Sequence, residues 1–341
     1  MDIPHSLSML LPMLHFARLP WPADWQEVFG CEAPMIVELG FGGGDNLITL
    51  AKENPAANVL GVEISLPSLR RGASKITNAK LSNARVVQGD SRTVLWLLFR
   101  PQSISSVVIN FPDPWPKAGH HHRRVINGPF LDLLANRMIP GAPLDIATDH
   151  DAYQEVIEAC LVESNHFDSR IDQPYLFSVE NRRQTKYERI ALAEGRIPHY
   201  YLWQRNRVPA PDDFPIPEET AVPHVILIPS LSLADFGSRF EPFHVQDEDM
   251  HIKFLNMFYS VDKEVLLSEV YVSEEPYRQR VGLSIRRRRE GDLVVSLYEM
   301  GFPRPTPGIH LAVKHLVSWL HKQDPGLTIV NSTLTEEIDP D

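Results

Sequence analysis

Short apolar segments alternate with amphipathic ones along the first part of the chain. Five runs of β-branched and other apolar residues lie at positions 35–40, 58–64, 84–90, 106–110 and 143–149. Such runs, with little polar alternation, are typical of parallel strands that are covered on both faces. Between them lie stretches able to form helices, such as 45–54 and 67–79. Strands that are repeatedly followed by helices predict a Rossmann-like, doubly wound α/β sheet.

The pattern changes in the last third of the chain. Residues 208–223 contain five prolines and several acidic residues, and this composition predicts a stiff, solvated linker. Beyond it we expect strands at 224–233, 264–274, 280–289 and 292–301, the last two joined by a Glu-Gly-Asp turn. The sequence therefore predicts an α/β domain at 1–207 and a smaller α+β domain at 224–341.

The smaller domain also contains a clear helix signal. Thr306 suits the N-cap and Pro307 the first helical position. Apolar residues then recur at helical spacing and form one stripe; they are Ile309, Ala312, Val313, Leu316, Val317 and Leu320. Nothing in this pattern indicates what the domain does.

Composition narrows the class of protein. The chain has 341 residues, 43% of them hydrophobic, which is enough for two domains with sizeable cores. Its two cysteines, Cys31 and Cys160, form no CxxC motif and suit a reducing compartment. No stretch approaches the roughly 18 apolar residues of a membrane helix, and the N-terminal segment lacks a signal-peptide pattern. We expect a soluble, cytoplasmic protein without a membrane partner.

The net charge of −11 by itself argues against a nucleic-acid partner. The charge is, however, distributed unevenly along the chain. Residues 1–209 contain 21 Lys and Arg and 22 Asp and Glu, a balance of −1, whereas residues 210–341 contain 12 and 22, a balance of −10. Local basic clusters, rather than the total charge, set the affinity for phosphates. The first part of the chain can therefore bind nucleic acid even though the net charge of the whole chain is negative.

A glycine-rich turn follows the first predicted strand, in the sequence VELGFGGGDN. Glu38 ends the strand, and Gly40, Gly42 and Gly44 allow a tight turn where a ligand can lie against bare backbone. The dinucleotide pattern GxGxxG fails because Asp45 stands in place of its third glycine. Acids beside the turn disfavour an anionic pyrophosphate and favour a cationic ligand.

Two more acids end the next strands. Glu63 ends the second strand, where a carboxylate can hold both hydroxyls of a ribose, and Asp90 ends the third, where it can accept a hydrogen bond from an adenine amino group. Each alone is equally a solvated strand end or a helix cap. Together with Glu38 they describe a site for a sugar, an adenine and a positive centre, which are the parts of S-adenosylmethionine.

The fourth strand runs into NFPDPWPK and then HHHRR. These motifs, with VELGFGGGDN, GVEIS, DIATDH and the distal TKYERIALAEGRIPHYYLW, resemble the bacterial tRNA (guanine-N7-)-methyltransferase family over roughly residues 20–207. The resemblance implies a Rossmann-like methyltransferase fold. It also implies transfer of a methyl group from S-adenosylmethionine to N7 of a guanine in the tRNA variable loop, conventionally position 46.

The resemblance extends to single residues. It matches Glu38, Glu63 and Asp90 to cofactor contacts, and Asp113 of PDPW to the active-site acid, which we also expect to contact the cofactor. The positions that it matches to substrate contacts are Lys117, Asp149, Thr185, Lys186, Tyr187 and Glu188. The family usually has more Lys and Arg after PDPW, whereas this chain has His120, His121 and His122, which carry little charge at neutral pH. RNA binding by this segment is then weaker, or more sensitive to pH, than in the family.

Other basic and aromatic residues leave alternatives open. We expect Arg123 and Arg124 to contact phosphates and expect no metal site, because three adjacent histidines point in divergent directions. Trp115 either stacks on an extruded base or packs at the rim of the domain. The segment 181–196 either meets RNA or is a helix with a solvated face. The arginines at 286–289, which alternate between the faces of a predicted strand, either touch RNA or offset the acids around them.

The chemistry of the acceptor assigns a role to Asp113. Guanine N7 carries a lone pair and no proton, so its methylation requires no general base. We expect the Asp113 carboxylate, between Pro112 and Pro114, to orient the base and to stabilise the positive charge that develops on the purine.

Two other functions remain as alternatives. NFPDPW loosely resembles the motif of enzymes that methylate exocyclic base amines, although the inserted Asp-Pro disturbs that geometry. A non-catalytic RNA-binding subunit is the second alternative, and the retained acids argue against it. The sequence leaves open whether the protein is a monomer or a homodimer.

Overall fold

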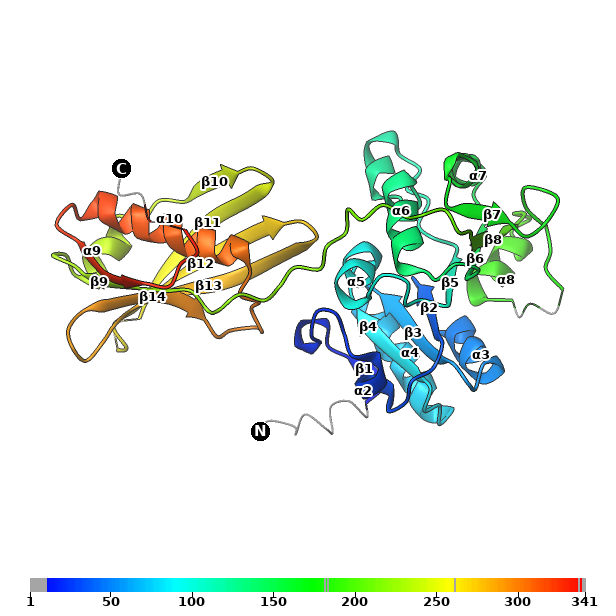
Figure 1. The fold of residues 1–341 in the computed structure, drawn as a ribbon, viewed down its shortest axis with the longest axis horizontal. Coiled ribbons are helices and arrows are strands. Elements are labelled where there is room, and N and C mark those ends of the chain that lie inside the picture. The colour runs from blue at the N-terminus through cyan, green and yellow to red at the C-terminus, as the bar shows by residue number, and fades with distance from the viewer. Residues whose placement is uncertain (1–10, 181, 183, 261, 337, 339–341) are drawn as a thin grey trace. The chain divides into compact units, whose positions relative to one another are not determined.

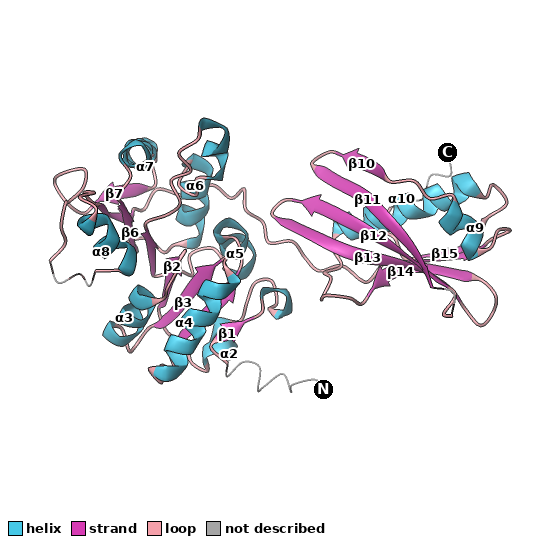
Figure 2. Cartoon of the chain, turned by 180° about the vertical axis from the view of Figure 1, so that it is seen from behind, coloured by secondary structure: helices cyan, strands magenta, loops and turns pink. Residues whose placement is uncertain are grey.

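The structure is a computed structural model that describes residues 11–180, 182, 184–260, 262–336 and 338. Two compact units form, Met1–Ile216 and Pro217–Asp341, each with its own sheet (Figures 1 and 2). Residues 1–10, which hold most of the segment searched for a signal peptide, lie outside the described part. In the described ranges, no helix has the length and apolar character required to cross a membrane.

An eight-stranded mixed sheet organises the described part of the first unit. Its order is β1-β4-β3-β2-β5-β6-β8-β7, and of these described strands β8 alone runs in the direction opposite to the other seven. The strands are β1 (Met13–Leu14), β2 (Met35–Leu39), β3 (Asn58–Glu63), β4 (Ala84–Gln88), β5 (Ser106–Asn110), β6 (Pro143–Thr148), β7 (Phe167–Ser169) and β8 (His199–Arg205). The five strands predicted for this part are all present.

Helices cover both faces of this sheet. The helices α3 (Asp45–Glu53) and α4 (Leu66–Asn78) pack together on one face, and α5 (Ser91–Leu98), α6 (Gly128–Arg137) and α7 (Asp151–Glu163) pack in series on the other. The shorter elements are η1 (Phe16–Arg18), α2 (Trp25–Phe29), η2 (Ala118–Arg123) and α8 (Lys186–Ala193). The predicted doubly wound α/β fold is confirmed.

The strand order reverses between β2 and β5. From β2 the chain proceeds outward to β3 and β4, and from β5 it proceeds outward to β6 in the opposite direction. The helices that follow β2 and β5 therefore lie on opposite faces, and a crevice opens at the carboxyl ends of these two strands. Glu38 and Asn110 stand at or beside those ends.

Phe41 fixes the glycine-rich turn above the sheet. Its ring fills a slot between β3 and α4 that exists because two neighbours lack side chains: a Cβ on Gly61 would lie 2.5 Å from the ring, and a Cβ on Gly72 would lie 2.6 Å from it. Gly44, with φ of +79°, then begins α3 in a left-handed conformation that suits glycine. The turn is thus held by packing beneath it, and its upper side stays open.

The predicted linker begins on the first unit. Arg137 is completely buried, and its Nη2 donates to the carbonyl of Phe214 at 2.7 Å. The Phe214 ring packs edge-on against Trp96 with centroids 5.0 Å apart, and the Trp96 indole donates to the Pro215 carbonyl at 2.7 Å. Burial lowers the pKa of Arg137 to about 10. This part of the segment is packed against the α/β unit, whereas the composition predicted a solvated linker.

A seven-stranded antiparallel sheet organises the described part of the second unit. Its order is β10-β11-β12-β13-β14-β9-β15. The strands are β9 (His224–Ile228), β10 (Phe243–Asp247), β11 (Met250–Ser260), β12 (Val265–Glu274), β13 (Tyr277–Arg287), β14 (Leu293–Tyr298) and β15 (Thr328–Ser332). The helices α9 (Leu233–Ser238) and α10 (Pro307–Gln323) pack on one face of it. The predicted apolar stripe of α10 is entirely buried there.

Three details of the second unit differ from the sequence prediction. The segment 224–233 is a strand only as far as Ile228, because Ser232 caps α9 in a capping box with Asp235. The strand β13 ends at Arg287, so Arg288 and Arg289 lie beyond it and do not alternate between its faces. The strands β10, β11 and β15 were not predicted.

The N-terminus of α10 also differs in its capping. Thr306 is the N-cap residue as predicted, but its hydroxyl makes no capping bond and instead bonds to Glu274 on β12. The other oxygen of Glu274 accepts from the Gly308 backbone N–H at 2.8 Å. A carboxylate from the sheet therefore caps this helix, which ties α10 to β12.

We predict that Gly72→Ala destabilises the protein by about 1–3 kcal/mol, because the new methyl group must displace the Phe41 ring. The matched control is Gly119→Ala, whose Cβ would meet no atom within 4 Å and which should change stability by less than about 1 kcal/mol. Urea denaturation of both variants checks this. Equal stability of the two variants would contradict the packing role of Phe41.

Candidate active site

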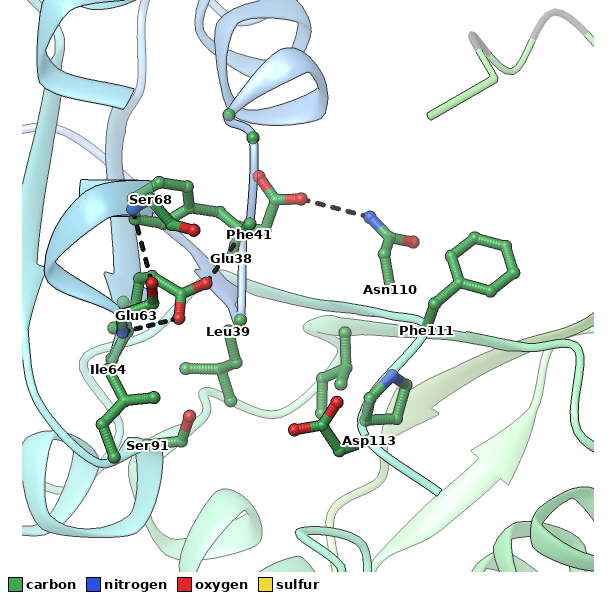
Figure 3. A pocket seen from close by; sticks show the side chains of 18 of the residues that line it. Glu38, Leu39, Phe41, Glu63, Ile64, Ser68, Ser91, Asn110, Phe111 and Asp113 are labelled. Atoms are coloured by element: carbon green, nitrogen blue, oxygen red, sulfur yellow. Dashed lines mark hydrogen bonds between the residues drawn. The ribbon is translucent and has the colours of Figure 1, made fainter. Parts of the chain in front are cut away.

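One cavity of about 730 Å³ opens at the carboxyl ends of the central parallel strands. Glu38, Glu63, Asp90 and Asp113 all line it, so the structure brings the four predicted carboxylates into one cleft. Figure 3 shows Glu38, Glu63 and Asp113. Other predicted site residues that line it are Gly40, Gly42, Gly44, Arg123, Thr185 and Tyr187. The cavity lies at the reversal point of the sheet, where open α/β folds bind their ligands.

Glu38 is the most deeply buried of the four acids, with 1% of its surface exposed. Its Oε1 accepts hydrogen bonds from Asn46 Nδ2 at 3.0 Å and from Asn110 Nδ2 at 3.2 Å, the second of which is visible in Figure 3. Its Oε2 has no partner among the described residues. Burial raises the pKa of Glu38 to about 7, although both amides act in the opposite direction. An unpartnered buried oxygen is costly, so Oε2 is suited to a cationic or hydrogen-bond-donating ligand.

Arg182 extends this network to the segment that precedes α8. Its Nη2 donates to Asn110 Oδ1 at 2.6 Å, which orients the amide so that its NH₂ group faces Glu38. The guanidinium also lies 5.0 Å from the ring centroid of Tyr200, and its Nε is 3.6 Å from Glu188. Arg182 therefore connects the distal part of the unit to the acid at the end of β2.

Glu63 and Asp90 each have a bond within the fold as well as a place in the cavity. The two oxygens of Glu63 accept from the backbone N–H groups of Gly42 and Ser65, both at 2.9 Å. Asp90 is exposed and caps α5 by accepting from the Thr93 N–H at 3.2 Å. Carboxylate oxygens have more than one lone pair, so both acids retain capacity to accept a bond from a ligand.

The loop after β5 presents Asp113 at the rim of the cavity. Asp113 is exposed, and Figure 3 shows its carboxylate directed into the cavity. Phe111 and Trp115 have φ of 51° and 42°, in the left-handed region that non-glycine residues seldom adopt. Arg124 holds the loop through a bond from its Nε to the Pro114 carbonyl at 2.8 Å. Strained backbone and an internal anchor thus set the position of the acid.

The two arginines of the predicted phosphate-binding segment are placed differently. Arg123 is exposed, lines the cavity and lies 4.8 Å from the Trp115 ring centroid. Arg124 is only 7% exposed and lies 5.0 Å from the ring of Tyr153, so its side chain serves the interior and not an RNA-facing surface. The histidines at 120–122 lie in η2, and the described residues contain no cluster of three or more metal-binding side chains.

The start of α8 divides into structural and accessible residues. Thr185 and Glu188 form a capping box, and Glu188 is 3% exposed and accepts from the Tyr200 hydroxyl at 2.6 Å. Tyr187 is 60% exposed, and its ring lies over the glycine turn, 3.4 Å from the position of a Cβ on Gly42. Of the two described residues of this segment that line the cavity, Thr185 and Tyr187, Tyr187 is the exposed one.

Three further predicted substrate contacts are not among the residues that line the cavity. Lys117 is exposed at the start of η2. Asp149 forms an ion pair with Arg196. The side chain of Lys186 lies outside the described residues.

Sequence reasoning missed the polar residues that support the acids. Asn110 carried a usable signal, because it ends a parallel strand at the same edge as Glu38. Asn46 had a weaker one, in the first turn after the glycines. Arg182 and Lys75 carried no signal of such a supporting role in the sequence. Lys75, which lies on α4 and 30 residues from Asp45 in the sequence, forms an ion pair with Asp45 at 2.6 Å. Only the fold creates this pairing.

The sheet order, the glycine turn and the buried acid at the reversal point define this unit as a Rossmann-like methyltransferase. Residues 32–199 match a family model described as "Putative methyltransferase". Over 300 residues the chain is 30% identical to the tRNA (guanine-N(7)-)-methyltransferase of Deinococcus radiodurans, covering 86% of this chain and 90% of that protein. The chain belongs to the tRNA (guanine-N(7)-)-methyltransferase family.

Two further similarities each cover a little more than half of this chain. The protein of the same name from Paraburkholderia xenovorans is 39% identical over 190 residues, which are 56% of this chain and 73% of that one. The crystal structure of an rRNA methylase from Streptococcus thermophilus aligns with a TM-score of 0.37 and 12% identity, over 51% of this chain and 88% of that chain.

We predict that Glu38→Gln changes how stability depends on pH. The pKa of Glu38 is about 7 in the folded protein and 4.5 as a model value, so between these pH values the folded state holds a proton that the unfolded state has lost. Stability of the wild type therefore falls as pH rises through this window, by roughly 3 kcal/mol from this residue. The variant lacks this loss and should be the more stable protein at pH 8 when no ligand is bound.

Guanidinium denaturation at intervals from pH 4.5 to 8 measures the difference between the two proteins. Glu53→Gln, which alters an exposed glutamate at the end of α3, is the control and should follow the wild type throughout. A constant difference between Glu38→Gln and wild type across this range would show that Glu38 does not titrate as described.

Proposed function

We propose that this protein transfers a methyl group from S-adenosylmethionine to N7 of a guanine in tRNA, conventionally position 46 of the variable loop. The family to which the chain belongs supports the reaction. The observation that carries the proposal is the buried carboxylate of Glu38, which lines the cleft at the reversal point of the sheet and whose Oε2 lacks a partner in the described structure. We also propose that the enzyme acts in the cytoplasm, with tRNA as its partner.

The donor half of the cleft has the groups that S-adenosylmethionine requires. Glu38 offers a carboxylate to the cationic methionine portion, beside the open backbone of Gly40, Gly42 and Gly44. Glu63 and Asp90, on the neighbouring strand ends, can accept from the ribose hydroxyls and the adenine amino group. The order of these acids along the edge of the sheet matches the order of those parts in the donor.

The acceptor half offers groups suited to a purine on an RNA strand. Asp113 projects into the cavity from the strained loop after β5. Trp115, Arg123 and Tyr187 also line this cavity, where aromatic rings can stack on a base that has left its helix and a guanidinium can contact a phosphate. We do not include Arg124 or Glu188 among the direct contacts, because both are buried.

The reaction requires positioning more than proton transfer. S-adenosylmethionine supplies an electrophilic methyl group, whose bond to sulfur breaks as a bond to the N7 lone pair forms, so that the positive charge moves from sulfur to the purine. N7 bears no proton before attack, so Asp113 has none to remove there. Its carboxylate would accept from the N1–H and amino edge of guanine and stabilise the developing charge. The fixed loop would hold the base in line with the methyl group.

We predict that Asp113→Asn lowers kcat by roughly 10²–10³ while S-adenosylmethionine binds with nearly unchanged affinity, because one preorganised charged group has been lost. Methyl transfer to a tRNA transcript gives kcat, and calorimetry gives the affinity for the donor. Glu38→Gln is the comparison, since it should weaken donor binding. Near-normal turnover by Asp113→Asn would refute the role of this acid.

The modified atom separates the proposal from its main alternative. Borohydride reduction followed by aniline cleaves RNA at 7-methylguanine and not at bases that are methylated on an exocyclic amine. Cleavage of the product tRNA at the variable-loop guanine supports the proposal. Methyl incorporation without cleavage identifies an amine methyltransferase, and absence of donor binding identifies a non-catalytic subunit.

A further inference from the structure

The sheet of the second unit has one face that no described helix covers. The helices α9 and α10 lie together on the opposite face, as the 6.4 Å contact between the rings of Phe236 and Trp319 indicates. Figures 1 and 2, taken from opposite sides, show α10 in front of the sheet and then behind it. We call the uncovered side the outer face. Side chains alternate along a strand, so the outer face consists of the strand residues that lie between the core-facing ones.

The outer face is basic within an acidic part of the chain. Its charged residues in the described strands are Lys253 on β11, Glu269 on β12, and Arg278, Arg280 and Arg286 on β13. These give four cations and one anion, although residues 210–341 have a balance of −10. Arg280 lies 2.6 Å from Glu269 and remains 62% exposed. Among the described strand residues of this face, Glu269 is thus the one acid beside four cations.

The outer face also presents aromatic rings beside these cations. Phe258 on β11 is 56% exposed, and Tyr298 on β14 is 43% exposed. Tyr271 on β12 is half-buried and pairs in register with Arg280 and with Lys253. Rings on an open antiparallel sheet can stack on unpaired bases while nearby arginines contact phosphates.

The centre of the face is closely packed, because larger neighbours cover the small residues there. Gly282 is opposite Tyr298 and Glu269 in the register of the strands, and Ser284 is opposite Ser296. A Cβ on Gly282 would lie 2.8 Å from Leu267. The exposed rings and guanidinium groups therefore stand around a centre that the Leu267 side chain fills, and they are the groups of this face that RNA can reach.

We infer that the outer face is a second RNA-binding surface, which contacts the tRNA substrate outside the methyl-transfer cleft. This inference rests on the proposed function for the identity of the RNA. Its physical basis is the complementarity between four cations and the phosphate backbone, joined to rings that can stack on bases. A second copy of the chain fits less well, because a symmetric contact would place like charges opposite one another.

The first experiment removes charge from the outer face of the full-length protein. Arg278→Gln with Arg286→Gln should weaken binding of an unmodified tRNA transcript by roughly 25- to 60-fold at 0.1 M salt. The slope of log K against log salt should also fall by about 1.5, since two phosphate contacts are lost. Arg239→Gln with Lys322→Gln removes the same charge from the helix side of this unit and should leave both quantities close to wild type.

The second experiment removes the rings. Phe258→Ala with Tyr298→Ala should lower tRNA affinity by roughly 5-fold or more per ring without changing the salt slope, a result that loss of charge does not produce. Thermal unfolding of each variant confirms that it is folded. Methyl transfer into a saturating concentration of tRNA should keep a kcat near wild type in every variant, because the cleft is unaltered.

The outcomes separate this inference from the proposed function. Unchanged tRNA affinity and an unchanged salt slope in both outer-face variants would overturn the inference. If those variants also change in sedimentation, a second copy of the chain occupies the face. If they instead lose binding to anionic vesicles, the face binds a lipid surface. Equal effects of the outer-face and helix-side charge variants would also overturn it. Failure of the wild type to form 7-methylguanine would refute the proposed function instead.

Discussion

The burial of the Glu38 carboxylate is the constraint around which the cleft is built. A carboxyl group with 1% exposure loses nearly all of its hydration, and burial accordingly raises its pKa to about 7. Two amides on one oxygen recover part of that cost, while the other oxygen stays unpaired in the described structure. The fold therefore maintains an unfavourable group at the point where a cationic ligand would offset it, as binding sites often do.

The surroundings of Glu38 follow from this constraint. Asn46 comes from the start of α3, Asn110 from the end of β5, and Arg182 from the segment before α8, so three distant parts of the chain must meet for the carboxylate to be held. The Phe41 ring beneath the turn fixes the helix that carries Asn46. The strained loop after β5 continues directly from Asn110 and carries Asp113. Glu38 and Asp113 are therefore linked through one strand end.

The two units use different designs. In the first, parallel strands are buried on both faces, so polar chemistry collects at the strand ends. In the second, antiparallel strands leave one face uncovered by described helices, so polar and aromatic residues can spread across the sheet itself. The segregation of Arg278, Arg280 and Arg286 onto that face gives an acidic part of the chain a local basic surface. The net charge of the chain alone does not indicate this basic surface.

The sequence by itself determined the elements whose signals are local. Apolar runs located the five central strands, and spacing located the stripe on α10, because one face or both faces of an element must be apolar where it is buried. Strand-end acids could be identified as a group, since parallel strands share one edge. The pattern failed at 224–233, where Ser232 begins a helix, and it missed β10 and β11, whose register depends on partners and a bulge.

Only the tertiary structure decided which polar residues line the cavity and which support the fold. Arg123 and Arg124 are adjacent in sequence, yet one lines the cavity and the other holds the Pro114 carbonyl from within. Tyr187 and Glu188 divide in the same way, because successive residues of a helix point in directions about 100° apart. The bond between Arg182 and Asn110 joins residues 72 apart. Side-chain direction and long-range pairing depend on the packing of the whole unit, and a linear pattern does not contain them.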